Sequence, residues 1–106
     1  MKEISYQKFI GDGETDLLRI RIWTENGKVV DLVVQYECLI NSRWHIIVRY
    51  DCSHGYFHRD ILFPNGDKEK QTVVLSSLKE ALNYSEQDIR DRYEFYKERY
   101  LKKIKK

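Results

Sequence analysis

The feature that most constrains the fold is an alternation of apolar and polar residues from about residue 17 to residue 63. Because successive side chains of a β-strand point to opposite faces, this period predicts strands with one apolar and one polar face. Asn26-Gly27 and Asn41-Ser42 interrupt the alternation and are typical of two-residue hairpin turns, whose central positions need a positive φ. Consecutive strands joined by such turns form an antiparallel meander.

The ends of the chain carry weaker signals. Ile4 and Tyr6 are candidates for a leading strand, and residues 72–75 for a final strand or the approach to a helix. A short helix is expected over residues 77–83. Ser85, followed by acidic residues, predicts the start of the main helix. Apolar and tyrosine residues then recur at helical spacing: Ile89, Tyr93, Tyr96, Tyr100 and Ile104.

We interpret this tyrosine stripe as contact with the sheet, with a docking face for another chain as the alternative. Asp88 and Arg92 are spaced for an i,i+4 ion pair on the solvated side of the helix. The predicted fold is α+β: a four- to five-stranded antiparallel β-meander with a C-terminal helix, or a helix pair, on one face. Residues 1–106 form a single domain, in which 1–75 are mainly β sheet and 76–106 are a helical segment with a basic tail.

Composition excludes several classes of protein. Hydrophobic residues make up 42% and charged residues 34% of the chain, as in globular domains and unlike disordered chains. No apolar run is long enough for a membrane span, and the N-terminal residues lack the pattern of a secretory signal. We therefore expect a cytoplasmic protein with no membrane partner. Cys38 and Cys52 lack zinc-ligand spacing, and the alternation places Cys38 inside.

The charge is unevenly distributed. Residues 97–106 contain six basic residues and one acidic residue, a net charge of +5, which leaves −3 for the other residues of a chain with a total of +2. A basic tail can attract nucleic acid or an acidic partner. Favourable placement of cations at a helix C-terminus explains it more simply.

A single helical layer covers only one face of the sheet, and the other face of an antiparallel sheet can be solvated. We expect the helix to cover the face of the sheet that carries the aliphatic side chains of the strands. The expected open face then carries Arg19, Arg21, Trp23, Gln35, Glu37, His45, Arg49, Asp51, His58 and Asp60. A β-bulge would move part of this set to the other face.

The densest group of reactive side chains is D-C-S-H-G-Y-F-H-R-D, residues 51–60, in a predicted strand–turn–strand. Three interpretations stay open. His54 and His58, with two aspartates, could bind a divalent metal, although no cofactor is required. The same residues suit metal-free RNA cleavage, in which both histidines exchange protons, Asp51 orients one of them and Arg49 binds phosphate. The hairpin could also be a solvated, ion-paired turn.

The segment Arg49-Tyr50-Asp51, followed by His54-Gly55 and His58, resembles a motif of TumE-like toxins of prokaryotic toxin–antitoxin pairs and related uncharacterised small domains. The resemblance covers about residues 17–64. Cys52 stands where asparagine is common, and Asp60 where a second histidine is common. The resemblance implies a protein that acts on RNA and a helix-turn-helix antitoxin as its partner.

The leading hypothesis is a toxin-like protein that acts on RNA, as a metal-independent ribonuclease with catalytic residues His54, His58, Asp51 and Arg49. The alternative is a non-catalytic protein- or RNA-binding module that uses the open sheet face or the tyrosine-lined helix. In either case the candidate substrate-binding residues are Arg19, Arg21, Trp23 and Arg59. A homo-oligomer is compatible with the sequence.

Overall fold

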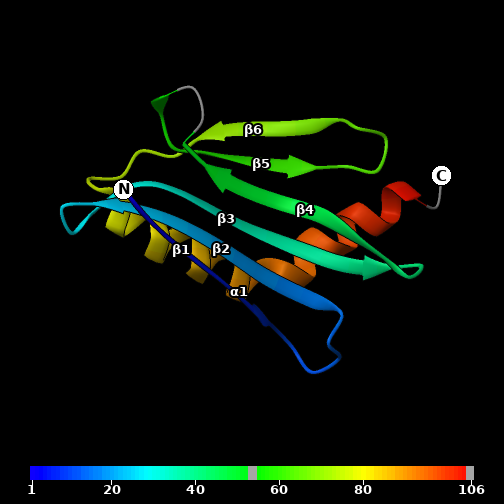
Figure 1. Ribbon diagram of the computed structural model, residues 1–106. Coiled ribbons are helices and arrows are strands. Elements are labelled where there is room, and N and C mark those ends of the chain that lie inside the picture. Colours follow the sequence, from blue (N-terminus) through cyan, green and yellow to red (C-terminus); the bar gives the residue numbers. More distant parts are fainter. Residues whose placement is uncertain (53–54, 105–106) are drawn as a thin grey trace.

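The computed structural model describes residues 1–52 and 55–104, which form an antiparallel sheet and one helix (Figure 1). The sheet has six strands in the order of the chain. The elements are β1 (Lys2–Phe9), β2 (Asp16–Glu25), β3 (Lys28–Ile40), β4 (Arg43–Asp51), β5 (His58–Leu62), β6 (Lys68–Thr72) and α1 (Leu78–Ile104). The predicted α+β meander is confirmed, with one strand more than expected.

Two hairpin turns have the predicted backbone. Asn26 and Gly27 have φ values of 51° and 76°, and Asn41 and Ser42 have φ values of 51° and 66°. Two successive positive values match the right-handed twist of the strands that they connect. These turns therefore set the order β2–β3–β4 at the centre of the sheet.

The additional strand is β6, at one edge of the sheet. Its sequence, Lys-Glu-Lys-Gln-Thr, is exposed along its whole length, so no burial imposes an alternating pattern on it. Of the expected strand at residues 72–75, only Thr72 lies in a strand. The N–H of Val73 extends the pairing by one hydrogen bond to the carbonyl of Phe57 (3.0 Å).

The helix is continuous from Leu78 to Ile104, which confirms the predicted C-terminal helix and not the helix pair that was its alternative. Ser77 caps its N-terminus, because Ser77 Oγ accepts a hydrogen bond from the Glu80 N–H (3.1 Å). The Glu80 carboxylate accepts one from the Ser76 N–H, and this contact lowers the pKa of Glu80. Ser85 caps nothing: it is buried, and its hydroxyl donates to the carbonyl of Ala81 (2.8 Å). Within residues 1–52 and 55–104, no helix has the length and apolarity needed to cross a membrane.

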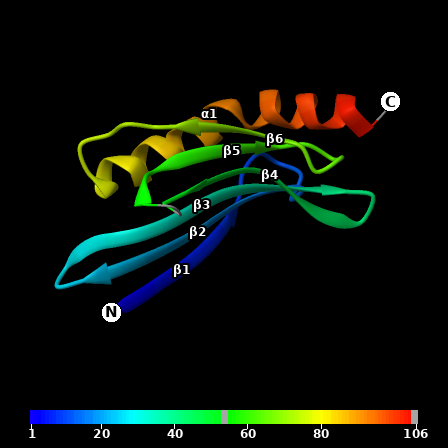
Figure 2. The ribbon, with the colours of Figure 1, turned by 90° about the horizontal axis from the view of Figure 1, so that it is seen from above.

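Helix α1 lies along one face of the sheet and packs mainly on β3 and β4 (Figure 2). Ile89, Tyr96 and Tyr100 of the predicted stripe are buried in the core, which confirms that this side of the helix contacts the sheet. Ile104, at the end of the stripe, is exposed. The opposite face of the sheet has no helix over it in the described residues, and we call it the open face.

A β-bulge in β4 changes which side chains reach the open face. Tyr36 pairs with Val48 and Glu37 with Ile46, so Ile47 is an extra residue in β4. Ile47 and Val48 both join the core. Before the bulge the alternation is reversed, and His45 lies under the helix with Nδ1 3.1 Å from the hydroxyl of Tyr100. The prediction that His45 lies on the open face is therefore wrong.

The same reversal brings Trp44 and Ile46, which the alternation places inward, to the open face. Trp44 pairs with Leu39 and Ile46 with Glu37, and both side chains are exposed. A second bulge in β3, where Trp23 pairs with Asp31 and Thr24 with Val29, leaves Val30 exposed. The remaining residues of the predicted open face keep their expected parity.

Candidate functional site

The register of the central strands aligns the candidate residues in two neighbouring rows across the open face. In one row Arg19 pairs with Gln35, Gln35 with Arg49, and Arg49 with Asp60. The next row contains Arg21, Val33, Asp51 and His58. Because residues paired across strands lie close together on one face, the sheet itself brings these side chains into contact.

The contacts form a continuous chain of polar groups. Arg19 Nε donates to Glu37 Oε2 (2.7 Å), and Gln35 Nε2 donates to the same oxygen (2.6 Å). Arg49 Nη1 donates to Gln35 Oε1 (3.3 Å), and Arg49 Nε donates to Asp51 Oδ2 (2.8 Å). We call this chain, with His58 and Asp60 at its end, the polar ladder. It extends from β2 to β5.

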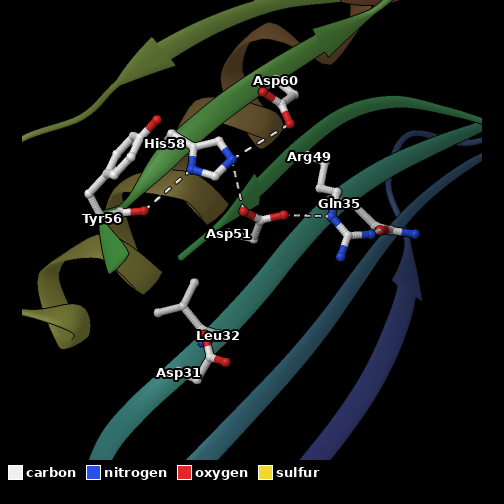
Figure 3. A network of polar contacts seen from close by, with 8 residues as sticks. All are labelled: Asp31, Leu32, Gln35, Arg49, Asp51, Tyr56, His58 and Asp60. Atoms are coloured by element: carbon white, nitrogen blue, oxygen red, sulfur yellow. Dashed lines mark hydrogen bonds and ion pairs between the residues drawn. The ribbon is translucent and has the colours of Figure 1, made fainter. Parts of the chain in front are cut away.

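His58 closes the polar ladder (Figure 3). Its Nε2 lies 2.9 Å from Asp51 Oδ1 and 3.6 Å from Asp60 Oδ2, and its Nδ1 lies 3.3 Å from the carbonyl oxygen of Tyr56. Its side chain is 1% exposed. Each ring nitrogen thus faces acceptor oxygens inside the protein. In this arrangement the ring holds the Asp51 carboxylate, and through it Arg49, rather than meeting a ligand.

The predicted catalytic group is therefore only partly assembled in the described chain. Asp51, His58 and Arg49 are in contact, as predicted, whereas His54 lies outside the described residues. Across residues 1–52 and 55–104, no three His, Cys, Asp or Glu side chains are placed to hold a metal ion. The catalytic and metal-binding roles of His54 stay predictions.

The cations of the polar ladder stand above its acids. The side chains of Arg19 and Arg49 are 42% and 40% exposed, whereas those of Glu37 and Asp51 are 9% and 10% exposed. Arg21, beside the ladder, is 48% exposed and its partner Glu3 is 44% exposed. The three guanidinium groups line a hollow of about 160 Å³ with Val33 and Gln35. A larger hollow of about 420 Å³ adjoins it and is lined by Arg19, Arg21 and residues of β1. We call the first the arginine hollow.

Trp23 lies beside the arginine hollow, but its polar and aromatic groups are already in use. Its Nε1 donates to Glu3 Oε1 (3.1 Å), and the guanidinium carbon of Arg21 lies 4.9 Å from the ring centroid. Arg21 also pairs with Glu3 (3.2 Å). Trp23 therefore holds Arg21 in place at the outer edge of the site.

Arg59 lies on the other face of the sheet, although we predicted it to bind substrate. Its Nη1 donates to the Tyr96 hydroxyl (2.8 Å) and lies 3.5 Å from Asp88 Oδ2, beneath the helix. Asp88 also accepts hydrogen bonds from Tyr50 (2.7 Å) and Tyr96 (2.6 Å). Asp88 is thus no solvated partner of Arg92, and Arg59 is separate from the arginine hollow.

Burial and the bonds to Asp88 raise the pKa values of Tyr50 and Tyr96 above their usual value. Both phenols therefore remain protonated donors at neutral pH. We call Arg59, Asp88, Tyr50 and Tyr96 the buried network. It joins β4 and β5 to α1 and so keeps the helix on the face opposite to the polar ladder.

One sequence signal could have revealed the reversed part of β4. Ile46, Ile47 and Val48 are three successive apolar residues in a strand that otherwise alternates. The run is compatible with an extra residue that turns two neighbours to the same face, but it is not specific, because Leu32, Val33 and Val34 form a similar run that pairs regularly.

These features define an α+β protein: over residues 1–52 and 55–104, helix α1 leaves one face of a six-stranded antiparallel sheet open, with an arginine-lined polar site on that face. The chain belongs to the family described as Domain of unknown function (DUF7718), whose family model matches residues 1–106. No curated protein and no solved structure matches it significantly. The resemblance to TumE-like toxins stays a prediction, because the family description assigns no function.

Proposed function

We propose that the open face binds single-stranded RNA through the phosphate groups of its backbone. The observation that carries this proposal is the arginine hollow, in which Arg19, Arg21 and Arg49 converge on one small concave surface. Guanidinium groups suit phosphate because they offer several N–H donors in a planar arrangement.

The charges favour an anionic ligand even though each arginine has an acidic partner. The carboxylates of Glu37 and Asp51 lie low and nearly buried, whereas the guanidinium groups of Arg19 and Arg49 reach solvent. Arg21 is about as exposed as its partner Glu3, so Arg19 and Arg49 supply the excess of accessible positive charge. Arg19 uses only Nε in its bond to Glu37, so both terminal nitrogens can donate to a ligand. An approaching molecule therefore meets positive charge and unused donors.

The polar ladder pre-positions these donors. Asp51 and Gln35 hold the guanidinium of Arg49 from two sides, and His58 holds Asp51 in turn. Fixing a long side chain before binding reduces the entropy that the complex loses. His58 is thus a positioning residue in this proposal.

The test is fluorescence anisotropy of a short labelled single-stranded RNA. Arg19→Gln and Arg21→Gln are each expected to lower the affinity about tenfold and to reduce the salt dependence of binding by about one phosphate contact. The matched control is Arg90→Gln, which makes the same charge change at an arginine that pairs with Glu86 on the helix.

Equal losses in Arg21→Gln and Arg90→Gln would show a general charge effect and refute the proposed site. Binding that disappears only when Lys102 and Lys103 are replaced by glutamine would assign it to the basic end of the helix. Absence of RNA binding in the wild-type protein would also refute the proposal.

RNA cleavage and a toxin-like role are supported by the residue types and the TumE-like resemblance. The same RNA, incubated with the wild-type protein and separated on a gel, tests for cleavage. Cleavage that is lost in His54→Ala while RNA binding persists would support a ribonuclease. Intact RNA after incubation with a protein that binds it would favour the non-catalytic alternative. Co-purification with a helix-turn-helix protein encoded beside it would support the antitoxin partner.

A further inference from the structure

A small apolar patch interrupts the polar surface of the open face. Phe9, Trp44 and Ile46 are 49%, 42% and 38% exposed. Leu17, which pairs with Phe9, is buried, yet it does not belong to the core cluster under the helix. Glu37 lies between Leu17 and Ile46 in the pairing of the strands. We call Phe9, Trp44, Ile46 and Leu17 the aromatic patch. Exposed apolar side chains gathered over a buried one usually mark a binding surface.

The two rings of the aromatic patch are already stacked. The ring centroids of Phe9 and Trp44 lie 6.4 Å apart, with 29° between the planes. Phe9 comes from β1 and Trp44 from β4, so the pair spans the sheet from its edge strand. The β4 bulge turns Trp44 to this side, and bulges often re-aim side chains next to functional sites.

The aromatic patch adjoins the proposed phosphate site. Phe9 pairs with Leu17, and Leu17 precedes Arg19 by two residues on the same face of β2. Two residues of a strand span about 7 Å, which a nucleotide can bridge between its phosphate and its base. Arg19 also lines both hollows on this face.

We infer that the aromatic patch stacks an unpaired RNA base whose phosphate binds at Arg19, an inference that rests on the proposed RNA binding. Unpaired bases stack on aromatic side chains while cations hold the backbone, and this combination is typical of single-strand recognition. The neighbouring guanidinium groups distinguish this occupant from an apolar protein segment. Trp23, the aromatic residue suggested by the sequence, is engaged by Arg21 and Glu3 and has less ring surface to offer.

The chain contains two tryptophans, so their fluorescence can report which ring meets a base. Trp23→Phe retains only Trp44, and Trp44→Phe retains only Trp23. Single-stranded RNA is expected to quench the fluorescence of Trp23→Phe strongly and that of Trp44→Phe weakly. Inorganic polyphosphate, which has charge but no bases, is expected to quench neither variant strongly.

Affinity measured by RNA anisotropy gives a second test. Trp44→Ala is expected to weaken RNA binding about tenfold, a loss typical of one stacked base. Binding of polyphosphate should be unchanged. The control is Phe95→Ala, which removes a similarly exposed ring from the helix.

The possible failures are distinguishable. If the wild-type protein binds RNA and Arg21→Gln weakens binding, but Trp44→Ala behaves like Phe95→Ala, the base-stacking inference is overturned and the proposed function stands. If the wild-type protein binds no RNA, both are refuted. A protein that self-associates through Trp44, with RNA binding unaffected by Trp44→Ala, would make the patch a contact between copies and overturn the inference.

Discussion

Asp88 is the residue whose replacement tests the described fold most directly. Its carboxylate accepts hydrogen bonds from Tyr50 and Tyr96 and lies 3.5 Å from Arg59, at the contact between sheet and helix. The Asp88 and Arg59 side chains are only 9% and 13% exposed, so water can replace few of the polar contacts that a substitution of Asp88 removes. Asp88→Asn retains the shape of the side chain and removes its charge.

The expected loss of stability follows from the Arg59 guanidinium, which the substitution leaves without its anionic partner. Breaking a buried ion pair by removing one partner costs roughly 3–5 kcal/mol, because the other charge stays desolvated. Asparagine still accepts a hydrogen bond with its amide oxygen, so we expect the lower end, about 3 kcal/mol. The free energy of unfolding of single domains is about 5–15 kcal/mol, so the variant should lose a large share of its stability.

The assay is urea unfolding followed by circular dichroism and tryptophan fluorescence. The unfolding midpoint should fall while the slope m stays constant, since the surface exposed on unfolding is unchanged. Asp91→Asn makes the same change at an exposed helix position, where the carboxylate accepts a hydrogen bond from Gln87. It should cost less than about 0.5 kcal/mol.

A double-mutant cycle identifies the cause. Arg59→Met removes the desolvated charge, so adding it to Asp88→Asn should restore part of the stability, with a coupling energy of about 1 kcal/mol or more. A loss below about 1 kcal/mol in Asp88→Asn, or no difference from Asp91→Asn, would refute the view that this carboxylate anchors the helix.

Three further predictions concern other parts of the fold. Because the pKa of Tyr96 is raised in the folded protein, its contribution to stability is complete below pH 10.0 and is lost as the pH rises beyond that value. The part of the tyrosinate absorbance that Tyr96→Phe removes should therefore appear only with unfolding. Gly11→Ala should lower the unfolding free energy, measured by chemical denaturation, more than Gly27→Ala does. Both positions have a positive φ, but at Gly11 the new Cβ would lie 2.6 Å from the Tyr93 hydroxyl oxygen, whereas at Gly27 it would meet nothing within 4 Å. Equal losses would show that the Tyr93 ring moves aside freely. His58→Ala should lower the unfolding free energy by about 3 kcal/mol, because the Asp51 carboxylate loses a buried hydrogen-bond partner and the missing ring leaves a cavity, and an unchanged urea midpoint would contradict this.

The central sheet was predictable because burial of one face produces a regular alternation of apolar and polar residues in the sequence. Strands β2 to β5 and two of their turns follow from that alternation, and so do the positions of Arg19, Arg49, Asp51 and His58 on one face. Strand β6 has no such alternation, since both of its faces are exposed. Ser85 resembles a helix cap in sequence, but a buried hydroxyl can also bond to the preceding turn of a helix.

The candidate site was harder to predict because contacts depend on register as well as parity. Arg59 illustrates this: its charge suggested a ligand site, whereas it alternates with Phe57 and Ile61 on the helix side, where the fold pairs it with Asp88, a residue 29 positions later in the chain. The exposure of Trp44 on the open face was missed because regular alternation assigns Trp44, together with Ile46, to the core. Only the extra residue of β4 decides this point, and it becomes certain once the pairing with β3 is known.

Ile47 thus acts as a phase shift within one strand. After Ile47 the odd-numbered residues of β4, Arg49 and Asp51, lie on the open face. Before Ile47 an even-numbered residue, Trp44, lies on that same face. Deleting this one residue would make β4 a regular strand without moving its other side chains: Trp44 would still oppose Leu39 on the open face, and His45 would still oppose Cys38 under the helix. A strand one residue shorter would then present the same surface with a different spacing between its tryptophan and its arginine in the sequence. Relatives of this protein should therefore be compared strand by strand, in register with β3, before any of their side chains are taken as equivalent.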